Sequence, residues 1–326
     1  MHSTSATARS TGALYLLLLS FAAPPVFAQG TSRGVQLFEL GDWAGAKAEL
    51  SVAVQRNARD ARAHYYLGRL ALIDDDPDTG SDHLERAVTL DQNVSDYHLW
   101  FGNALSEQAS RASALKHLVL AGRLKSEFDR AVELDARNID AREALIDFYS
   151  MAPGVMGGGI DKARGEAQAI ARIDAMRGHL AFARLAVIAK DKGLVEREMN
   201  AAIAAAPDNF RPYSALSTWY AREKQWPQAF STLDAYIKQH PSDSYGPYGI
   251  GRIAAASGQQ LDRGERGIKD FLARPPKDAG PLAFSRAYQR LGQVLEHQGK
   301  RAEAHSAIEQ AVKIDPRNED AKKALK

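Results

Sequence analysis

Cysteine is absent from the 326-residue sequence, and neither sign of charge is in large excess. Without cysteine the chain can form no disulfide, offer no thiolate to a metal and carry no lipid on a cysteine at a processing site. Lysine and arginine number 42 and the acidic residues 40, which leaves a net charge of +2. This balance lacks the basic excess of nucleic-acid-binding proteins, so we expect no nucleic-acid partner.

Long apolar runs are scarce, and the one that stands out lies near the N-terminus. In "ARSTGALYLLLLSFAAPPVFAQG" a basic residue, Arg9, precedes the run, and a proline pair separates the run from the small residues Val26 and Ala28. This is the layout of a secretory signal peptide, with cleavage expected between Ala28 and Gln29. The run of about eleven residues is shorter than the roughly 17 to 25 that a transmembrane helix needs. We therefore expect residues 1–28 to be removed, leaving a periplasmic or secreted chain with no integral membrane segment.

Motifs that mark catalytic or metal sites are also missing. The nine histidines include no His-x-x-x-His pair, and there is no Gly-x-Ser-x-Gly nucleophile elbow. The acidic run at 74–78 precedes a helical pattern but lacks the spaced ligands and closing glutamate of a calcium loop. We expect no enzyme activity, no cofactor and no bound metal.

What the sequence has instead is an internal period. Gly34, Gly68 and Gly102 are spaced by 34 residues, and apolar residues within each period follow two helices joined by a short turn. The clearest copy is "SRAYQRLGQVLEHQGKRAEAHSAIEQAVKIDPRN" at 285–318, with a Leu-Gly pair, a turn glycine, small residues where two helices meet and a proline at its end. This pattern resembles the tetratricopeptide repeat.

The resemblance implies an all-α fold, a right-handed superhelical solenoid of about eight tetratricopeptide-like helix hairpins. The third unit, which begins near Ser95, is longer than the 34-residue period. We interpret the additional residues as an enlarged connection between its helices or as longer helices. The repeat register divides the mature chain into four parts. They are N-terminal units over 29–138, irregular units with a glycine-rich loop over 139–209, C-terminal units over 210–318 and a capping helix over 319–326.

The glycine-rich stretch "MAPGVMGGGIDKA" at 151–163 falls between the two helices of the fourth unit. It lacks the Lys-Ser or Lys-Thr pair of a phosphate-binding loop, and the segment before it has helical rather than strand periodicity. Three hypotheses are a spacer or ordered loop between helices, a loop that contacts a partner, and an anion site at the start of the next helix. Asp161 disfavours the last, since an acid already lies at the positive end of that helix.

The resemblance also implies that the first helix of each unit lines a concave face that holds peptides. Residues spaced i, i+3 and i+7 on those helices share this face, which reads as basic and aromatic at both ends and acidic in the middle, at Asp140, Glu143 and Asp147. Tyrosine and arginine are frequent interface anchors. The residue set with which co-chaperone members clamp a C-terminal carboxylate is absent. The predicted partner-binding residues are Arg62, Tyr65, Arg69, Asn103, Arg211, Tyr245, Tyr248, Arg252 and Arg286.

Three hypotheses for function follow from these features. The leading one is a non-enzymatic scaffold or adaptor that binds a protein or peptide partner in its concave groove, in the assembly of an envelope complex. The second is an accessory subunit of a polysaccharide synthesis or export complex, or of another envelope enzyme. The third is a structural protein that self-associates through the ends of its solenoid.

Overall fold

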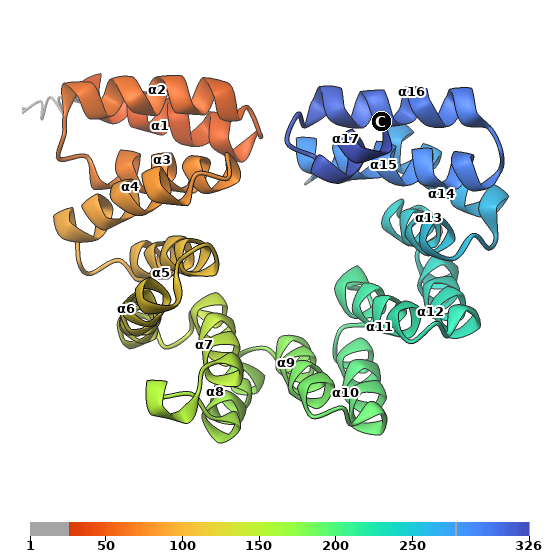
Figure 1. The fold of residues 1–326 in the computed structure, drawn as a ribbon, viewed down its shortest axis with the longest axis horizontal. Coiled ribbons are helices and arrows are strands. Elements are labelled where there is room, and N and C mark those ends of the chain that lie inside the picture. Colours follow the sequence, from red (N-terminus) through yellow and green to blue (C-terminus); the bar gives the residue numbers. More distant parts are fainter. Residues whose placement is uncertain (1–25, 278, 326) are drawn as a thin grey trace, which may run out of the picture.

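The computed structural model describes residues 26–277 and 279–325. In this part of the chain there are seventeen α-helices, one short 3-10 helix and no strand, and the first sixteen α-helices pair into eight consecutive hairpins (Figure 1). The predicted all-α solenoid of about eight hairpins is therefore confirmed. None of the described helices has the length and apolar composition needed to cross a membrane. Most of the predicted signal peptide, residues 1–25, lies outside the described residues.

Glycines of the 34-residue period mark the points where the two helices of a hairpin touch. A Cβ atom added at Gly68 would lie 2.5 Å from Cγ of Leu84, and one at Gly102 would lie 2.4 Å from Cε1 of Phe128. Both distances are shorter than van der Waals contact, so a side chain there would push the helices apart. The period in the sequence is thus the period of helix-to-helix contact.

Three of the first four helices begin with caps that the sequence supplies. Asp42, Asp60 and Asp76 each accept a hydrogen bond from a backbone N–H in the first turn of the following helix. The first helix starts at Val26, and the extra residues of the third unit lengthen its helices. The helices are α1 (Val26–Glu39), α2 (Trp43–Arg56), α3 (Ala61–Ile73), α4 (Pro77–Leu90), α5 (Ser95–Ser110) and α6 (Ala114–Leu134).

The middle hairpins are regular although their sequences are not. The glycine-rich stretch is an ordered inter-helix loop, in which Gly159 N donates to Tyr149 O at 2.8 Å and Gly158 N donates to Pro153 O at 3.2 Å. Gly157 and Gly159 have positive φ, which glycine adopts without strain. The elements are α7 (Ile139–Met151), the 3-10 helix η1 (Gly154–Met156), α8 (Ile160–Ile173), α9 (Ala175–Ile188) and α10 (Lys192–Ala205).

The C-terminal hairpins end in the expected capping helix. Ala321 of this last helix is fully buried and packs with Ile308 and Ala311 of the preceding one. The cap therefore covers apolar surface that an additional repeat would otherwise cover. The helices are α11 (Phe210–Arg222), α12 (Trp226–Gln239), α13 (Tyr245–Ser257), α14 (Leu261–Ala273), α15 (Pro281–His297), α16 (Arg301–Ile314) and α17 (Glu319–Ala324).

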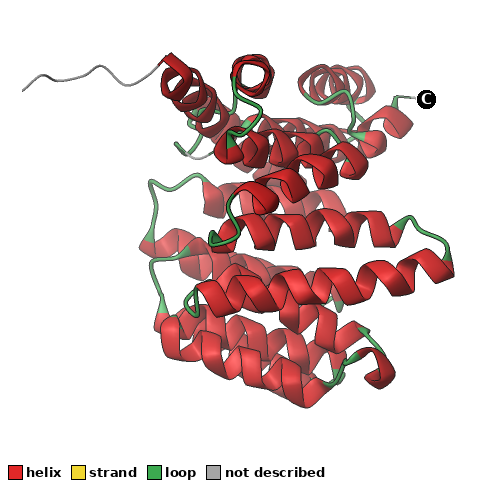
Figure 2. Cartoon of the chain, turned by 90° about the vertical axis from the view of Figure 1, so that its left-hand side faces the viewer, coloured by secondary structure: helices red, strands yellow, loops and turns green. Residues whose placement is uncertain are grey.

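The first helices of the hairpins form an inner layer and the second helices an outer one (Figure 1). Consecutive first helices contact one another directly from α1 to α9 and from α11 to α15. The solenoid bends until its two ends meet, where the Arg317 guanidinium donates to the carbonyl oxygen of Ile73 and lies 3.4 Å from Asp74 Oδ1. Figure 2 shows the stacked helices from the side, with the loops at the edges of the stack. The inner layer thus lines an almost closed ring.

Candidate partner-binding face

At the N-terminal end of the inner layer, one arginine is surrounded by aromatic rings. The guanidinium carbon of Arg69 lies 4.5 Å from the ring centre of Phe38 and 4.4 Å from that of Trp100. Tyr65 and Tyr66 lie at 5.3 and 5.5 Å. Arg69 also donates to the Tyr65 hydroxyl at 3.3 Å. Three successive inner helices, α1, α3 and α5, thereby hold one cation by cation–π contacts.

Arg69 is charged but pairs with no carboxylate among the residues that the structure describes. Its Nε atom is buried and has no hydrogen-bond partner there. A buried donor without a partner is costly. The aromatic rings offset part of that cost, and an acceptor brought by a ligand would remove more of it.

Tyr65, predicted to contact a partner, lies in the core instead of on the surface. It is 6% exposed and packs against Tyr97, with ring centres 4.9 Å apart. Burial raises the pKa of its hydroxyl to about 12, although Arg69 nearby acts in the opposite direction. The sequence pattern missed Trp100, which follows Asp96 by four positions and so shares its helix face. Arg62 is exposed on α3, as predicted.

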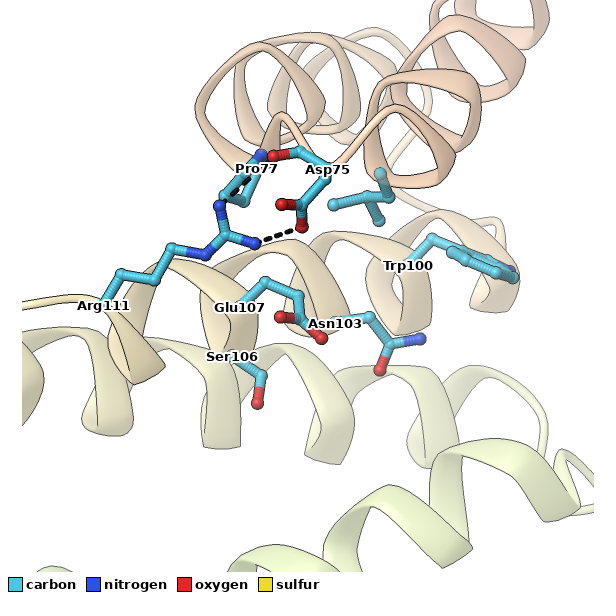
Figure 3. Close-up of a pocket in the computed structure, with 8 residues that line it drawn as sticks. Asp75, Pro77, Trp100, Asn103, Ser106, Glu107 and Arg111 are labelled. Atoms are coloured by element: carbon cyan, nitrogen blue, oxygen red, sulfur yellow. Dashed lines mark hydrogen bonds and ion pairs between the residues drawn. The ribbon is translucent and has the colours of Figure 1, made fainter. Parts of the chain in front are cut away.

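Asn103 lines a polar cleft of 350 Å³ between α5 and the turn after α3 (Figure 3). Trp100 and Glu107 of the same helix also line this cleft, and Arg111 lies at one end of it. Arg111 donates to the carbonyl oxygen of Asp75 at 3.2 Å and also to its carboxylate. The cleft therefore continues the inner face toward the edge of the solenoid.

The middle of the inner face is not acidic, which corrects the prediction from sequence. Arg177 of α9 pairs with Asp140 and with Glu143 of α7, the latter at 2.9 Å, and Arg184 pairs with Asp147. Each acid of α7 that was expected to face a partner therefore has an arginine beside it. The sequence pattern treated each helix separately and missed these pairs between neighbouring helices.

Arg211, also a predicted contact, lies at the edge of this charged network. Its side chain is exposed, and its guanidinium is 3.8 Å from Glu143 Oε2. Burial raises the pKa of Asp147 even though Arg184 opposes that shift. The middle of the face is thus a network of compensated charges.

At the C-terminal end one arginine, Arg252, contacts hydroxyl groups instead of carboxylates. Arg252 of α13 donates to Ser214 Oγ at 3.0 Å and to Thr218 Oγ1 at 3.1 Å, both on α11. Burial lowers the pKa of Arg252, and the nearby positive charges of Arg290 and Arg286 lower it further, against an opposite effect of a tyrosine. No carboxylate in the described part of the chain forms an ion pair with any of these three arginines.

Two tyrosines predicted to contact a partner also hold the inner helix α13 in place. The ring of Tyr248 stacks on Phe271 with ring centres 4.4 Å apart, and that of Tyr245 stacks on Phe210 at 5.6 Å. Burial raises the pKa of Tyr248, while Arg252, Arg290 and Arg286 lower it. The structure therefore gathers Tyr248, Arg252 and Arg286 into one cluster. Arg69 and Asn103 lie across the ring from it, on α3 and α5 (Figure 1).

No group of three or more histidine, aspartate or glutamate side chains within 26–277 and 279–325 is placed to hold a metal ion. His64 and His83 form a pair of titratable rings, with their Nδ1 atoms 2.9 Å apart. That distance fits a hydrogen bond between two neutral imidazoles. The groups that the inner face offers for binding are those described above: aromatic rings such as Trp100, arginines such as Arg252, and the amide of Asn103.

Comparison with known proteins places a tetratricopeptide repeat at residues 285–318, where the family model matches. No curated protein matches this chain. Among solved structures, a thermophilic tetratricopeptide protein of Thermus thermophilus is 17% identical, with a TM-score of 0.48, and the match covers 57% of this chain and 95% of that one. One from Parabacteroides merdae is 10% identical, with a TM-score of 0.49 and coverages of 92% and 97%. YrrB, a tetratricopeptide protein with an unusual peptide-binding site, is 15% identical, with a TM-score of 0.36 and coverages of 75% and 98%.

Proposed function

We propose, from the premise that this chain is a solenoid of tetratricopeptide-like hairpins, that it is a non-enzymatic scaffold that binds a protein or peptide partner on its concave face. One observation carries the proposal: the inner helices line one face of the ring, and the two ends of this layer carry arginines without carboxylate partners, beside aromatic rings. Such residues are the usual anchors of protein interfaces. A ring of inner helices also gives a partner contact with several hairpins at once.

We further propose that the partner belongs to a complex of the bacterial envelope. The support is the signal-peptide pattern at residues 1–28, which directs a chain out of the cytoplasm. Assembly of such a complex needs proteins that hold other subunits, and an extended groove suits that role. Association with an envelope enzyme and self-association are the competing outcomes of the experiment below.

The test is an affinity capture from envelope extract with the mature chain and two triple variants. One variant replaces exposed arginines of the inner helices, Arg62, Arg211 and Arg286, with alanine. The control replaces three exposed arginines of the outer helices α2, α10 and α16, namely Arg56, Arg197 and Arg301. Both variants lose the same charge, so a nonspecific electrostatic effect would be equal in the two.

We expect the inner variant to lose the partner and the outer variant to keep it. A partner kept by both variants would move the binding site away from the concave face. Capture of copies of the chain alone would favour self-association, and capture of an enzyme would favour the accessory-subunit role. Thermal unfolding followed by circular dichroism checks that both variants remain folded.

A further inference from the structure

The inner helices α11, α13 and α15 carry an unbalanced charge. Together they hold five arginines and a single acidic residue, Glu296, in the last turn of α15. By contrast, α7 and α9 hold three acids and three arginines, and the acids are paired as described above. The five arginines are Arg211, Arg222, Arg252, Arg286 and Arg290.

Three of these arginines form one cluster on the helices α13 and α15, which pack against each other. Arg252 is half-buried and is held by the hydroxyl groups of Ser214 and Thr218. Arg290 donates to Gln293 Oε1 at 2.8 Å within its own helix, and Arg286, one turn earlier, is exposed. Burial raises the pKa of the Tyr248 hydroxyl, and the charges of all three arginines lower it. Arg252 and Arg290 are therefore bound by neutral oxygens. The arginines of α9, by contrast, are bound by carboxylates of α7.

We propose that this cluster of Arg252, Arg286 and Arg290 is a binding site for the carboxylate side chains of an acidic peptide segment. The proposal rests on the proposed function and specifies its ligand. A guanidinium presents paired N–H donors that match the two oxygens of a carboxylate. In the middle of the ring, the carboxylates of α7 pair with the arginines of α9. At this cluster, a carboxylate of the partner would take the same role.

The charge of the rest of the chain favours acidic peptide over nucleic acid. A nucleic-acid surface needs a basic stripe long enough to follow many phosphates. Here the net charge is only +2, and the arginines between the clusters are paired with acids. The three arginines of this cluster lie on two neighbouring helices, α13 and α15, which suits a few carboxylates of one segment.

Fluorescence anisotropy with labelled hexaglutamate tests the site, with hexaglutamine and oligothymidylate as the competing probes. The variant is Arg286→Ala with Arg290→Ala, and the matched control is Arg301→Ala with Lys313→Ala, which removes two exposed positive charges from the outer helix of the same hairpin. We expect hexaglutamate to bind the parent chain, with affinity falling as salt rises from about 50 to 200 mM. The double variant should weaken binding about tenfold or more, and the control should change it less than about twofold.

Three results would overturn the assignment. These are equal binding of hexaglutamine, an equal loss in the double variant and the control, or tighter binding of oligothymidylate with the same arginine dependence. If the double variant does not fold, Arg286→Glu replaces it, because this exposed position tolerates a charge and the reversal should abolish hexaglutamate binding. If envelope capture depends on the inner face but hexaglutamate does not bind, the scaffold proposal stands and this one is wrong.

Discussion

At the scale of the residue, the stability of a hairpin depends on two kinds of position: those with no room for a side chain, and those where a polar group needs a hydrogen-bond partner. Gly292 is one such position, since an added Cβ atom would lie 2.5 Å from Ile308 Cδ1. The histidine pair of the second hairpin is another, since one hydrogen bond between the two Nδ1 atoms gives each of these atoms a partner. Both kinds of position lead to measurable predictions.

Replacing Gly292 with leucine should destabilise the last hairpin. The new side chain would overlap Ile308, and overpacking of a core typically costs about 1 to 3 kcal/mol. Gly122→Leu is the control, because no atom lies within 4 Å of a Cβ there. Urea unfolding should show a lower midpoint for Gly292→Leu and an unchanged or higher one for Gly122→Leu. Equal losses in the two variants would contradict the helix register.

Acid should destabilise the second hairpin through His64 and His83. Burial is the main cause of the lowered pKa of both rings. The unfolded chain therefore binds protons first, and stability falls as pH drops below the unfolded value of about 6.5. Protonation of both rings would also place two N–H groups against each other across the 2.9 Å contact.

His83→Gln is the matching variant, because glutamine can still donate to His64 Nδ1 but does not titrate. Urea midpoints of the parent chain should fall between about pH 7.5 and 5.5, and those of the variant should fall less. Carboxylates titrate mainly below this range, so they contribute little to the difference. The same decrease in both proteins would show that this pair is not responsible.

At the scale of the element, each hairpin is stable only where a neighbour covers its apolar face. The glycine-rich loop shows how an insertion is tolerated, because its backbone N–H groups are bound by Tyr149 O and Pro153 O. The charge pairs between α7 and α9 act across the same kind of boundary. Neighbouring hairpins therefore determine both packing and surface charge.

Deleting residues 319–326 should loosen the last hairpin and leave distant ones unchanged. The deletion removes Ala321 and exposes Ile308 and Ala311, which it covers. Since repeats interact with their neighbours, the loss should stay local. Hydrogen exchange should accelerate in α15 and α16 but not in α7 to α10. Uniform acceleration along the chain, or none, would show that α17 is not a cap.

At the scale of the whole molecule, the solenoid turns far enough for its ends to touch. The contact of Arg317 with Ile73 and Asp74 joins the turn after α3 to the segment before α17. A second contact brings the turn at Gly41 close to Pro281, since a Cβ on Gly41 would lie 3.1 Å from Pro281 Cδ. The ends therefore limit how widely the ring opens.

Arg317→Ala should open the ring. An exposed ion pair is worth up to about 1 kcal/mol, which changes the ratio of open to closed molecules about fivefold. Small-angle scattering should give a larger radius of gyration for the variant. Arg274→Ala is the control, since Arg274 pairs with Asp270, one helical turn before it. An unchanged radius for Arg317→Ala would show that this contact does not hold the ends together.

The repeat and its helices can be predicted from the sequence alone, because they depend on local signals. The spacing of Gly34, Gly68 and Gly102 marks contacts within hairpins, and the aspartate caps mark helix starts. The expected number of hairpins, about eight, came from this period and from its resemblance to the tetratricopeptide repeat. The same signals placed Arg62 and Arg286 correctly on exposed positions of inner helices.

Which groups of the inner face are left for a partner depends instead on how neighbouring helices pack. Tyr65 has the spacing of a surface residue but is buried, because the next helix lies over it. From the sequence of α7 alone its acids have no partner, but in the structure they pair with arginines of α9. Arg252, by contrast, is bound by hydroxyl groups of α11. Charge compensation and burial between neighbouring helices depend on residues about one repeat or more apart, and the pattern within one helix contains no information about them.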